Sequence, residues 1–179
     1  MRHILLISRS FPHHRPGGME WHVQDIAEGL MEAGWRVSVL TTPLPEEPAL
    51  RALEVNGEII ETGKRSARYD LSFFAGFRGK TRKKIRHLNP DIIHAQGLAG
   101  IPAWQAFRRE IPVITTIHGT LWSETPLREV FSTRGRKISS ANSLKLLWKY
   151  KHRLLFARTW RKFLKQHPPL ILDSQFTLN

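Results

Sequence analysis

The 179-residue sequence contains no cysteine. This absence excludes disulfide bonds, thiolate metal sites and cysteine nucleophiles, and it suits a reducing compartment. Long apolar runs are also missing, because the run after Met1-Arg2-His3 covers only Ile4 to Ile7. No segment approaches the roughly 20 apolar residues that a membrane-spanning helix needs. We therefore expect a soluble, cytoplasmic protein that rests at most peripherally on the cytoplasmic face of a membrane.

Acidic residues are scarce relative to basic ones, 15 against 28, and the formal net charge is +13. The imbalance begins after residue 63: residues 1–63 hold five basic and nine acidic side chains, residues 64–110 eleven and three, and residues 111–179 twelve and three. Such an excess attracts phosphate groups on nucleic acid, on anionic lipid or on phosphorylated small molecules. Solvated helix faces are the simpler explanation for any single Lys or Arg.

Apolar spacing predicts alternating strands and helices. Short apolar runs predict strands at residues 4–7, 37–40, 59–60, 91–95, 113–117 and 170–173. Helical spacing predicts helices at residues 19–31 with Gly34 as the cap, 80–86, 102–109 and 143–166, while 64–79 and 120–139 lack a regular pattern. This order of elements predicts a single α/β domain over residues 1–179 with a Rossmann-like, doubly wound parallel sheet.

In such a sheet, ligands bind beyond the carboxyl ends of the strands. Gly17 and Gly18 lie at that edge before a helix N-terminus, where unpaired N–H groups favour an anion, although a tight turn would also explain them. His94 and His118 each end an apolar strand, which suggests a polar pocket, although a structural role is common for a single histidine there. Glu20, in the first helical turn, fits a ligand-facing carboxylate and a residue favoured by the helix dipole equally well.

Several motifs that would indicate other functions are missing. The chain has no G-x-G-x-x-G and no P-loop, which argues against a dehydrogenase and an NTPase, and the spacing of His13, His14 and His22 does not match a zinc site. No carboxylate pair suggests a glycosidase. There is also no RNP, KH, zinc-finger or helix-turn-helix signature. An alternative function is that of a basic α/β module that binds nucleic acid or nucleotides without catalysis. The positive charge of the chain is the only feature that supports it.

Segments in the right order along the chain resemble a known family. They are Pro16-Gly17-Gly18-Met19-Glu20, residues 33–42, Pro90 to Gln96, Pro112 to Gly119 and residues 172–177. Together these resemble P-x-x-G-G-x-E, G-H-x-V-x-V, P-D-[IV]-[IV]-H-[AS]-H, P-x-[IV]-x-T-x-H-[DG] and [IV]-x-x-S-x-x-[TL], the patterns of the retaining, family 4-like glycosyltransferases with the GT-B fold. The chain departs from them at Trp35, where His is commonest, and at Gln96, which replaces a second His.

The resemblance implies the N-terminal, acceptor-binding domain of a hexosyltransferase that uses a nucleotide-diphosphate sugar, retains configuration and needs no metal or other cofactor. Gly17 and Gly18 would lie against the donor phosphates, His118 would be the catalytic residue beside the transferred sugar, and Glu20, His94 and Gln96 would bind the acceptor. The donor-binding C-terminal domain would be absent from this chain. We therefore expect the isolated chain to be inactive.

The resemblance also offers an explanation for the basic half of the chain. Membrane-associated members of this fold use basic and apolar residues of the N-terminal domain to reach lipid-linked or phosphorylated acceptors. The aromatic segment Phe73 to Phe77 has that composition and precedes a run of cations. This predicts a patch for a membrane or another anion, formed by Arg78, Lys80, Arg82, Lys83, Lys84 and Arg86, with an anionic membrane surface as a partner and nucleic acid as an improbable one.

Overall fold

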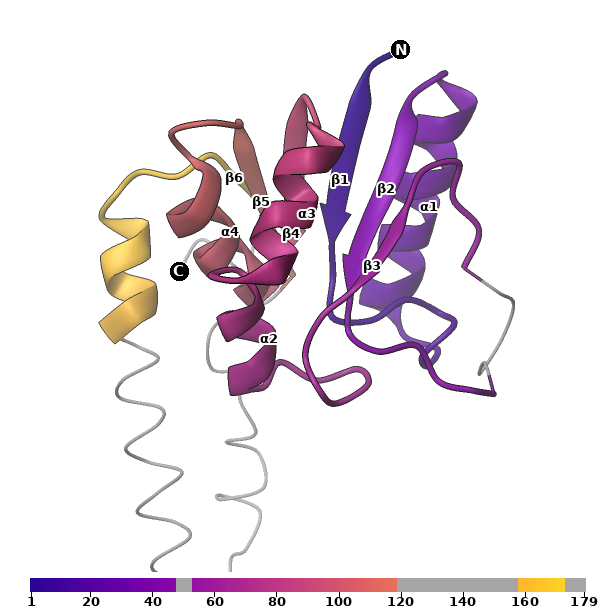
Figure 1. The fold of residues 1–179 in the computed structure, drawn as a ribbon, viewed down its shortest axis with the longest axis horizontal. Helices are drawn as coiled ribbons and strands as arrows, with labels where there is room; N and C mark the ends of the chain where they lie inside the picture. The colour runs from indigo at the N-terminus through magenta and orange to yellow at the C-terminus, as the bar shows by residue number, and fades with distance from the viewer. Residues whose placement is uncertain (48–52, 119–157, 173–179) are drawn as a thin grey trace, which may run out of the picture.

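The structure is a computed structural model that describes residues 1–47, 53–118 and 158–172 (Figure 1). The predicted loop at 120–139, most of the predicted helix at 143–166 and the predicted helix start at Ser174 lie outside these residues. The last part of that helix is described, and it is helical over residues 158–164.

The described residues form one six-stranded sheet in which every pairing is parallel. Its strands are β1 (His3–Ile7), β2 (Arg36–Thr41), β3 (Ile59–Glu61), β4 (Ile92–Gln96), β5 (Val113–Ile117) and β6 (Leu170–Leu172). Their order in space is β3-β2-β1-β4-β5-β6, and the direction of winding changes between β1 and β4. This is the doubly wound order of a Rossmann-like sheet, so the predicted fold class is confirmed.

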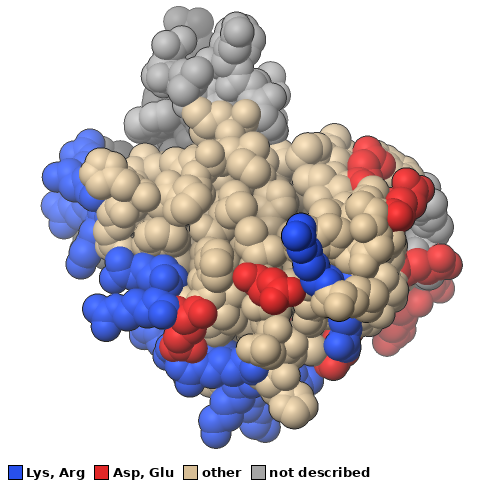
Figure 2. Space-filling model, turned by 90° about the horizontal axis from the view of Figure 1, so that it is seen from above, with Lys and Arg blue, Asp and Glu red and all other residues tan. Residues whose placement is uncertain are grey.

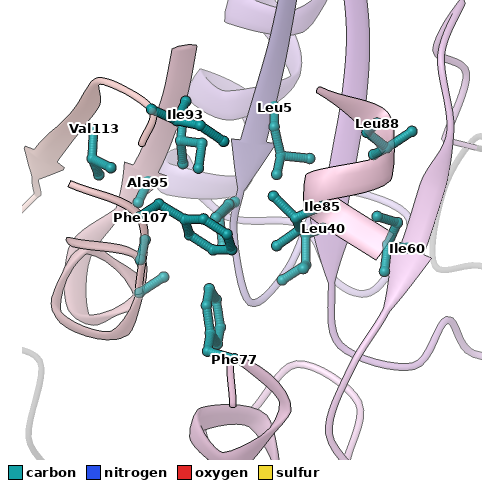
Figure 3. Packing of buried hydrophobic residues seen from close by; sticks show 14 of the residues in the cluster. Leu5, Leu40, Ile60, Phe77, Ile85, Leu88, Ile93, Ala95, Phe107 and Val113 are labelled. Atoms are coloured by element: carbon teal, nitrogen blue, oxygen red, sulfur yellow. The ribbon is translucent and has the colours of Figure 1, made fainter. Parts of the chain in front are cut away.

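Helices cover both faces of the sheet, because alternate residues of the buried strands point to opposite sides. On one face, Ile4 and Leu6 of β1 pack with Val23 and Ala27 of α1 (Gly18–Glu32). On the other face, Leu5 and Ile7 pack with side chains of α2 (Leu71–Gly76), α3 (Lys80–Leu88) and α4 (Gly100–Phe107). Figure 3 shows this second cluster, in which Phe77, Ile85 and Phe107 lie against the sheet.

Most helix ends follow local signals. Gly34, with φ of +80°, follows the C-terminal cap of α1 in a conformation that favours glycine. Asn89, with φ of +47°, ends α3 immediately before Pro90. The helix α4 begins at Gly100, two residues earlier than predicted, because the single turn η1 (Gly97–Ala99) leads into it. It also ends at Phe107, two residues before the predicted end.

One helix was not predicted: α2 lies inside the stretch 64–79 that lacks a regular apolar period. It is six residues long, too short for that period to show. The side chain of Asp70 caps it by accepting a hydrogen bond of 2.8 Å from the backbone N–H of Phe73. Its helical form depends on tertiary packing, because Phe73 is fully buried against the sheet.

Candidate active site

The carboxyl ends of the parallel strands meet at one edge of the sheet, at the lower end of the arrows in Figure 1. Ser8 and Ser10 follow β1, Thr42 follows β2, Gln96 ends β4 and His118 follows β5. The first turn of α1, which begins at Gly18, adjoins the loop that follows β1. The predicted site residues Gly17, Gly18, Glu20, His94, Gln96 and His118 therefore all belong to one region of the fold.

The loop before α1 is held by the carboxylate of Glu20. Glu20 is only 4% exposed. Its Oε1 accepts a hydrogen bond of 2.6 Å from the Ser10 hydroxyl and one of 3.1 Å from Nε of Arg15. The carboxylate is thus paired within the chain, and its predicted contact with the acceptor stays a prediction.

The environment of Glu20 keeps this carboxylate ionised. Burial alone would raise its pKa, but the hydrogen bonds from Ser10 and from its own backbone N–H, together with the charge of Arg15, outweigh burial. The pKa of Glu20 is therefore lowered from its ordinary value. The ionised carboxylate of Glu20, on α1, therefore accepts the hydrogen bonds from Ser10 and Arg15 that connect the loop to the helix.

The two glycines at the start of α1 have different surroundings. Gly17 has an extended backbone, with φ of 176°, so glycine is not required there by conformation. A Cβ atom on Gly17 would, however, lie 2.2 Å from Oε2 of Glu20. A Cβ atom on Gly18 would meet nothing within 4 Å, so this position leaves open space at the first helical residue. Gly17 makes room for the Glu20 carboxylate, and Gly18 leaves the helix N-terminus accessible.

This difference predicts that two matched substitutions affect the stability of the chain differently. Gly17→Ala should lower the free energy of unfolding by about 1–3 kcal/mol, because the new methyl group displaces the Glu20 carboxylate. Gly18→Ala should leave it within about 0.5 kcal/mol of wild type, since the position is open and alanine favours helix. Urea unfolding of both variants measures this. Equal losses in the two variants would contradict the role assigned to Gly17.

A second interaction pins the same loop to the end of β2. The backbone N–H of Phe11 donates to Nδ1 of His14 at 3.1 Å, and Nε2 of His14 donates to the Thr42 carbonyl at 3.2 Å. The Thr42 hydroxyl in turn donates to the carbonyl of Arg9 at 2.6 Å. Burial, the largest influence, lowers the pKa of His14, which favours the neutral ring that these bonds require. The loop is thus ordered by its own side chains.

The two predicted histidines are linked through Gln96. Nε2 of His94 lies 2.7 Å from the Thr116 hydroxyl and 3.3 Å from Nε2 of Gln96. Oε1 of Gln96 lies 2.7 Å from Nε2 of His118. Burial, followed by the charges of His22 and His118, lowers the pKa of His94 to about 4. His94 is therefore neutral around pH 7 and cannot act as a cation in this site.

His22 and Thr116 belong to this site but were not predicted as site residues. His22 lies on α1, and its ring contacts the ring of His118 edge to face, with centroids 5.2 Å apart. The sequence singles out His22 only by a spacing to His13 and His14 that does not match a zinc site. Within residues 1–47, 53–118 and 158–172, no three His, Asp or Glu side chains are placed to hold a metal ion. The signal that could have found His22 is its place in the first turns of the helix that follows the glycine pair.

The predicted basic patch divides into two parts. Arg86 pairs with Glu110 through two hydrogen bonds, and Arg82 reaches the same carboxylate at 3.2 Å. These hydrogen bonds lower the pKa of Glu110, and the hydrogen bond from Arg86 has the largest effect. The patch residues that stay exposed, with no ion pair among the described residues, are Arg78, Lys80, Lys83 and Lys84. In Figure 2, Lys and Arg gather on the left and lower sides of the molecule, and most acidic side chains lie on the right.

A groove of about 590 Å³ adjoins this patch. Its apolar walls come from α2 and from the first turn of α4, including Leu71, Phe74 and Ile101. Arg78 and Arg82 line the same groove, and Leu71 is 75% exposed. An apolar groove flanked by cations suits an amphiphile with a negative head group. In the part of the chain that the structure describes, no helix is long and apolar enough to cross a bilayer.

Comparison with known proteins identifies a family and several similar solved structures. The model of glycosyltransferase family 4 matches residues 16–153. Sucrose-phosphate synthase from Thermosynechococcus elongatus is 17% identical, with a TM-score of 0.52 over 96% of this chain and 47% of that chain. The chain thus spans about half the length of that protein. A UGT transferase from Siraitia grosvenorii, solved with UDP, is 18% identical, with a TM-score of 0.41 over 75% of this chain and 33% of that chain. No curated protein sequence matches significantly.

Proposed function

The chain belongs to glycosyltransferase family 4, and we propose that it forms the acceptor-side domain of an enzyme that transfers a hexosyl group from a nucleotide-diphosphate sugar with retention. The family predicted from the motifs is confirmed by the match over residues 16–153. The observation that carries the proposal is the contact between His118 and the N-terminal part of α1, where Gly18 leaves open space. A helix N-terminus, which favours anions, and a histidine thus share one edge of the sheet.

The proposed chemistry depends on positioning and electrostatics. Phosphate oxygens of the donor would accept hydrogen bonds from the N–H groups at the start of α1, next to Gly18. His118 would lie beside the sugar, and the leaving phosphate would accept the proton of the acceptor hydroxyl on the same face. No metal is required in this proposal, because the helix terminus supplies the partial positive charge. The nucleotide would be held by a second Rossmann-like domain.

Transfer assays test the proposal. Residues 1–179 alone should give negligible release of nucleoside diphosphate from UDP-, GDP- or ADP-hexoses, and the same residues linked to a donor-binding domain should turn one of them over. In that active form, His118→Ala should lower kcat by at least about 100-fold. His87→Ala, an exposed histidine on α3, is the matched control and should change little. Ordinary turnover by residues 1–179 alone would refute the need for a second domain, and equal activity of both histidine variants would refute the role of His118.

We further propose that the acceptor is lipid-linked and that the domain binds the cytoplasmic face of an anionic membrane. The support is the groove of apolar side chains beside the exposed cations of α3. A short helix carrying Lys80, Lys83 and Lys84 supplies electrostatic attraction, and Leu71 and Phe74 supply apolar contact area. A free phosphorylated acceptor would use the cations without the groove.

Vesicle co-sedimentation distinguishes these cases. The chain should bind vesicles that contain phosphatidylglycerol and not vesicles of phosphatidylcholine alone. Replacing Lys80, Lys83 and Lys84 by Gln should reduce binding at least about tenfold, since each basic residue near an anionic surface contributes about 1 kcal/mol. Replacing Arg161, Lys162 and Lys165 by Gln removes the same charge from another exposed segment and is the control. Equal losses in both triple variants would indicate nonspecific attraction. Binding to RNA on filters instead of to vesicles would favour the nucleic-acid alternative.

A further inference from the structure

Four polar side chains, two on β4, one on β5 and one directly after β5, form a continuous chain of hydrogen bonds. They follow the order Thr116, His94, Gln96 and His118, with successive distances of 2.7, 3.3 and 2.7 Å. Thr116 and Gln96 are 1% and 0% exposed, and His94 is 8% exposed. Buried polar groups in such a chain have few alternative partners, so the position of one proton constrains the others.

The direction of each bond follows from the Gln96 amide. Its Oε1 can only accept, so Nε2 of His118 must donate to it. Its NH2 group can only donate, so Nε2 of His94 must carry a lone pair. The Thr116 hydroxyl then donates to the same Nε2, which has no proton to offer. The neutral ring of His94 therefore carries its proton on Nδ1, and that of His118 on Nε2.

We propose that Gln96 is a positioning residue that sets the tautomer of His118, and that neutral His94 and the Thr116 hydroxyl set the orientation of Gln96. His118 then donates from Nε2 to Gln96, and its neutral ring keeps the lone pair on Nδ1. This proposal rests on the proposed function only for the role of His118 beside the sugar. The hydrogen-bond chain itself depends on no activity.

Protonation of His94 would reverse the donor and acceptor roles in this chain of hydrogen bonds. Nε2 of a cationic His94 would donate, the Gln96 amide would rotate to accept from it, and its NH2 group would face Nε2 of His118. Burial of His94, followed by the repulsion that His22 and His118 would exert when protonated, lowers its pKa to about 4 and so disfavours this state. The ring of His22 also packs on His118 from α1. The chain is therefore held in one direction around neutral pH.

Long-range ¹H–¹⁵N spectra of the imidazole rings test the proposal on residues 1–179 directly. Signals are assigned by their loss in His94→Gln and His118→Ala. Near pH 7, the wild-type chain should show His94 protonated on Nδ1 and His118 protonated on Nε2. His94 on Nε2 together with His118 on Nδ1 would overturn the proposal, as would His94 exchanging freely between both tautomers.

Gln96→Glu gives a second, directional test. A carboxylate accepts from both sides, so the proton of His94 should move to Nε2 and the pKa of His118 should rise by about one unit or more. Gln105→Glu is the matched control, because the same change on the exposed face of α4 should leave both rings unaltered. An unmoved His118 pKa in a folded Gln96→Glu variant would overturn the proposal.

The tautomers of the wild-type chain decide the matter if Gln96→Glu does not fold. If His94 is protonated on Nδ1 and His118 on Nε2, but the chain linked to a donor-binding domain never transfers sugar, the proposed function is refuted and the hydrogen-bond chain stands. If the linked chain is active but the rings carry the opposite tautomers, the hydrogen-bond chain is refuted and the proposed function stands.

Discussion

Glu20→Ala is expected to lower the free energy of unfolding by about 2 kcal/mol at neutral pH. The substitution leaves the buried Ser10 hydroxyl without its acceptor at 2.6 Å, and an unsatisfied buried polar group costs about 1–3 kcal/mol. The lost pairing with Arg15 adds little, because that side chain is half exposed and screened by water. Urea unfolding measures the loss. Glu32→Ala, an exposed acidic residue on the same helix, is the control and should change stability by less than about 0.5 kcal/mol.

The effect of Glu20→Ala should depend on pH in a defined direction. The pKa of Glu20 is lower in the folded chain than its ordinary value of 4.5, so the folded state binds this proton less readily. Its contribution to stability is present above about pH 4.5 and is lost as the pH falls through the folded pKa. The difference between wild type and Glu20→Ala should therefore shrink below that pH. A difference that stays constant would show that the charge of Glu20 has no part in holding the loop.

Acidification should destabilise the wild-type chain through His94 by about 3 kcal/mol. The pKa of His94 falls from 6.5 to about 4 on folding, mainly because the ring is buried. The unfolded chain takes up the proton below about pH 6.5 and the folded chain does not, so stability is lost between about pH 6.5 and pH 4. His3 and His14, whose pKa values are also lowered by burial, act in the same direction. The total loss therefore exceeds that of His94 alone.

His94→Gln isolates this contribution. Glutamine can still accept the hydrogen bond from Thr116 at the position of Nε2, but it does not titrate. The free energy of unfolding of the variant should fall about 3 kcal/mol less than that of wild type between pH 7 and pH 4. His87→Gln replaces an exposed histidine and should follow the wild-type curve. If the free energy of unfolding of His94→Gln depends on pH in the same way as that of wild type, His94 is not buried as a neutral ring.

Much of the fold could be predicted because apolar spacing reports burial directly. The strand β5 was predicted with its observed bounds, and β1, β2 and β4 to within one residue at each end. The unpredicted helix α2 shows the limit of this signal, since a helix of six residues has no full apolar period. Its formation depends on the burial of Phe73 and Phe77 against residues elsewhere in the chain.

The candidate site was predicted in part. Strand ends are visible in the sequence, and parallel strands bring them to one edge, so Gln96, His94 and His118 could be grouped without a structure. The contact of His22 with His118 joins residues 96 positions apart, and no local pattern encodes it. The predicted patch likewise could not reveal that Arg82 and Arg86 pair with Glu110 of a later segment.

The sequence pattern determines the order of the strands and of the longer helices, the absence of thiol chemistry and the division into an acidic first third and a basic remainder. These properties follow from residue type and spacing, which act locally. Tertiary structure alone decides which polar groups meet: the carboxylate of Glu20 turns to Ser10 and Arg15, and Gln96 stands between two histidines. Burial makes those meetings specific, because a polar group removed from water must find its partner within the fold.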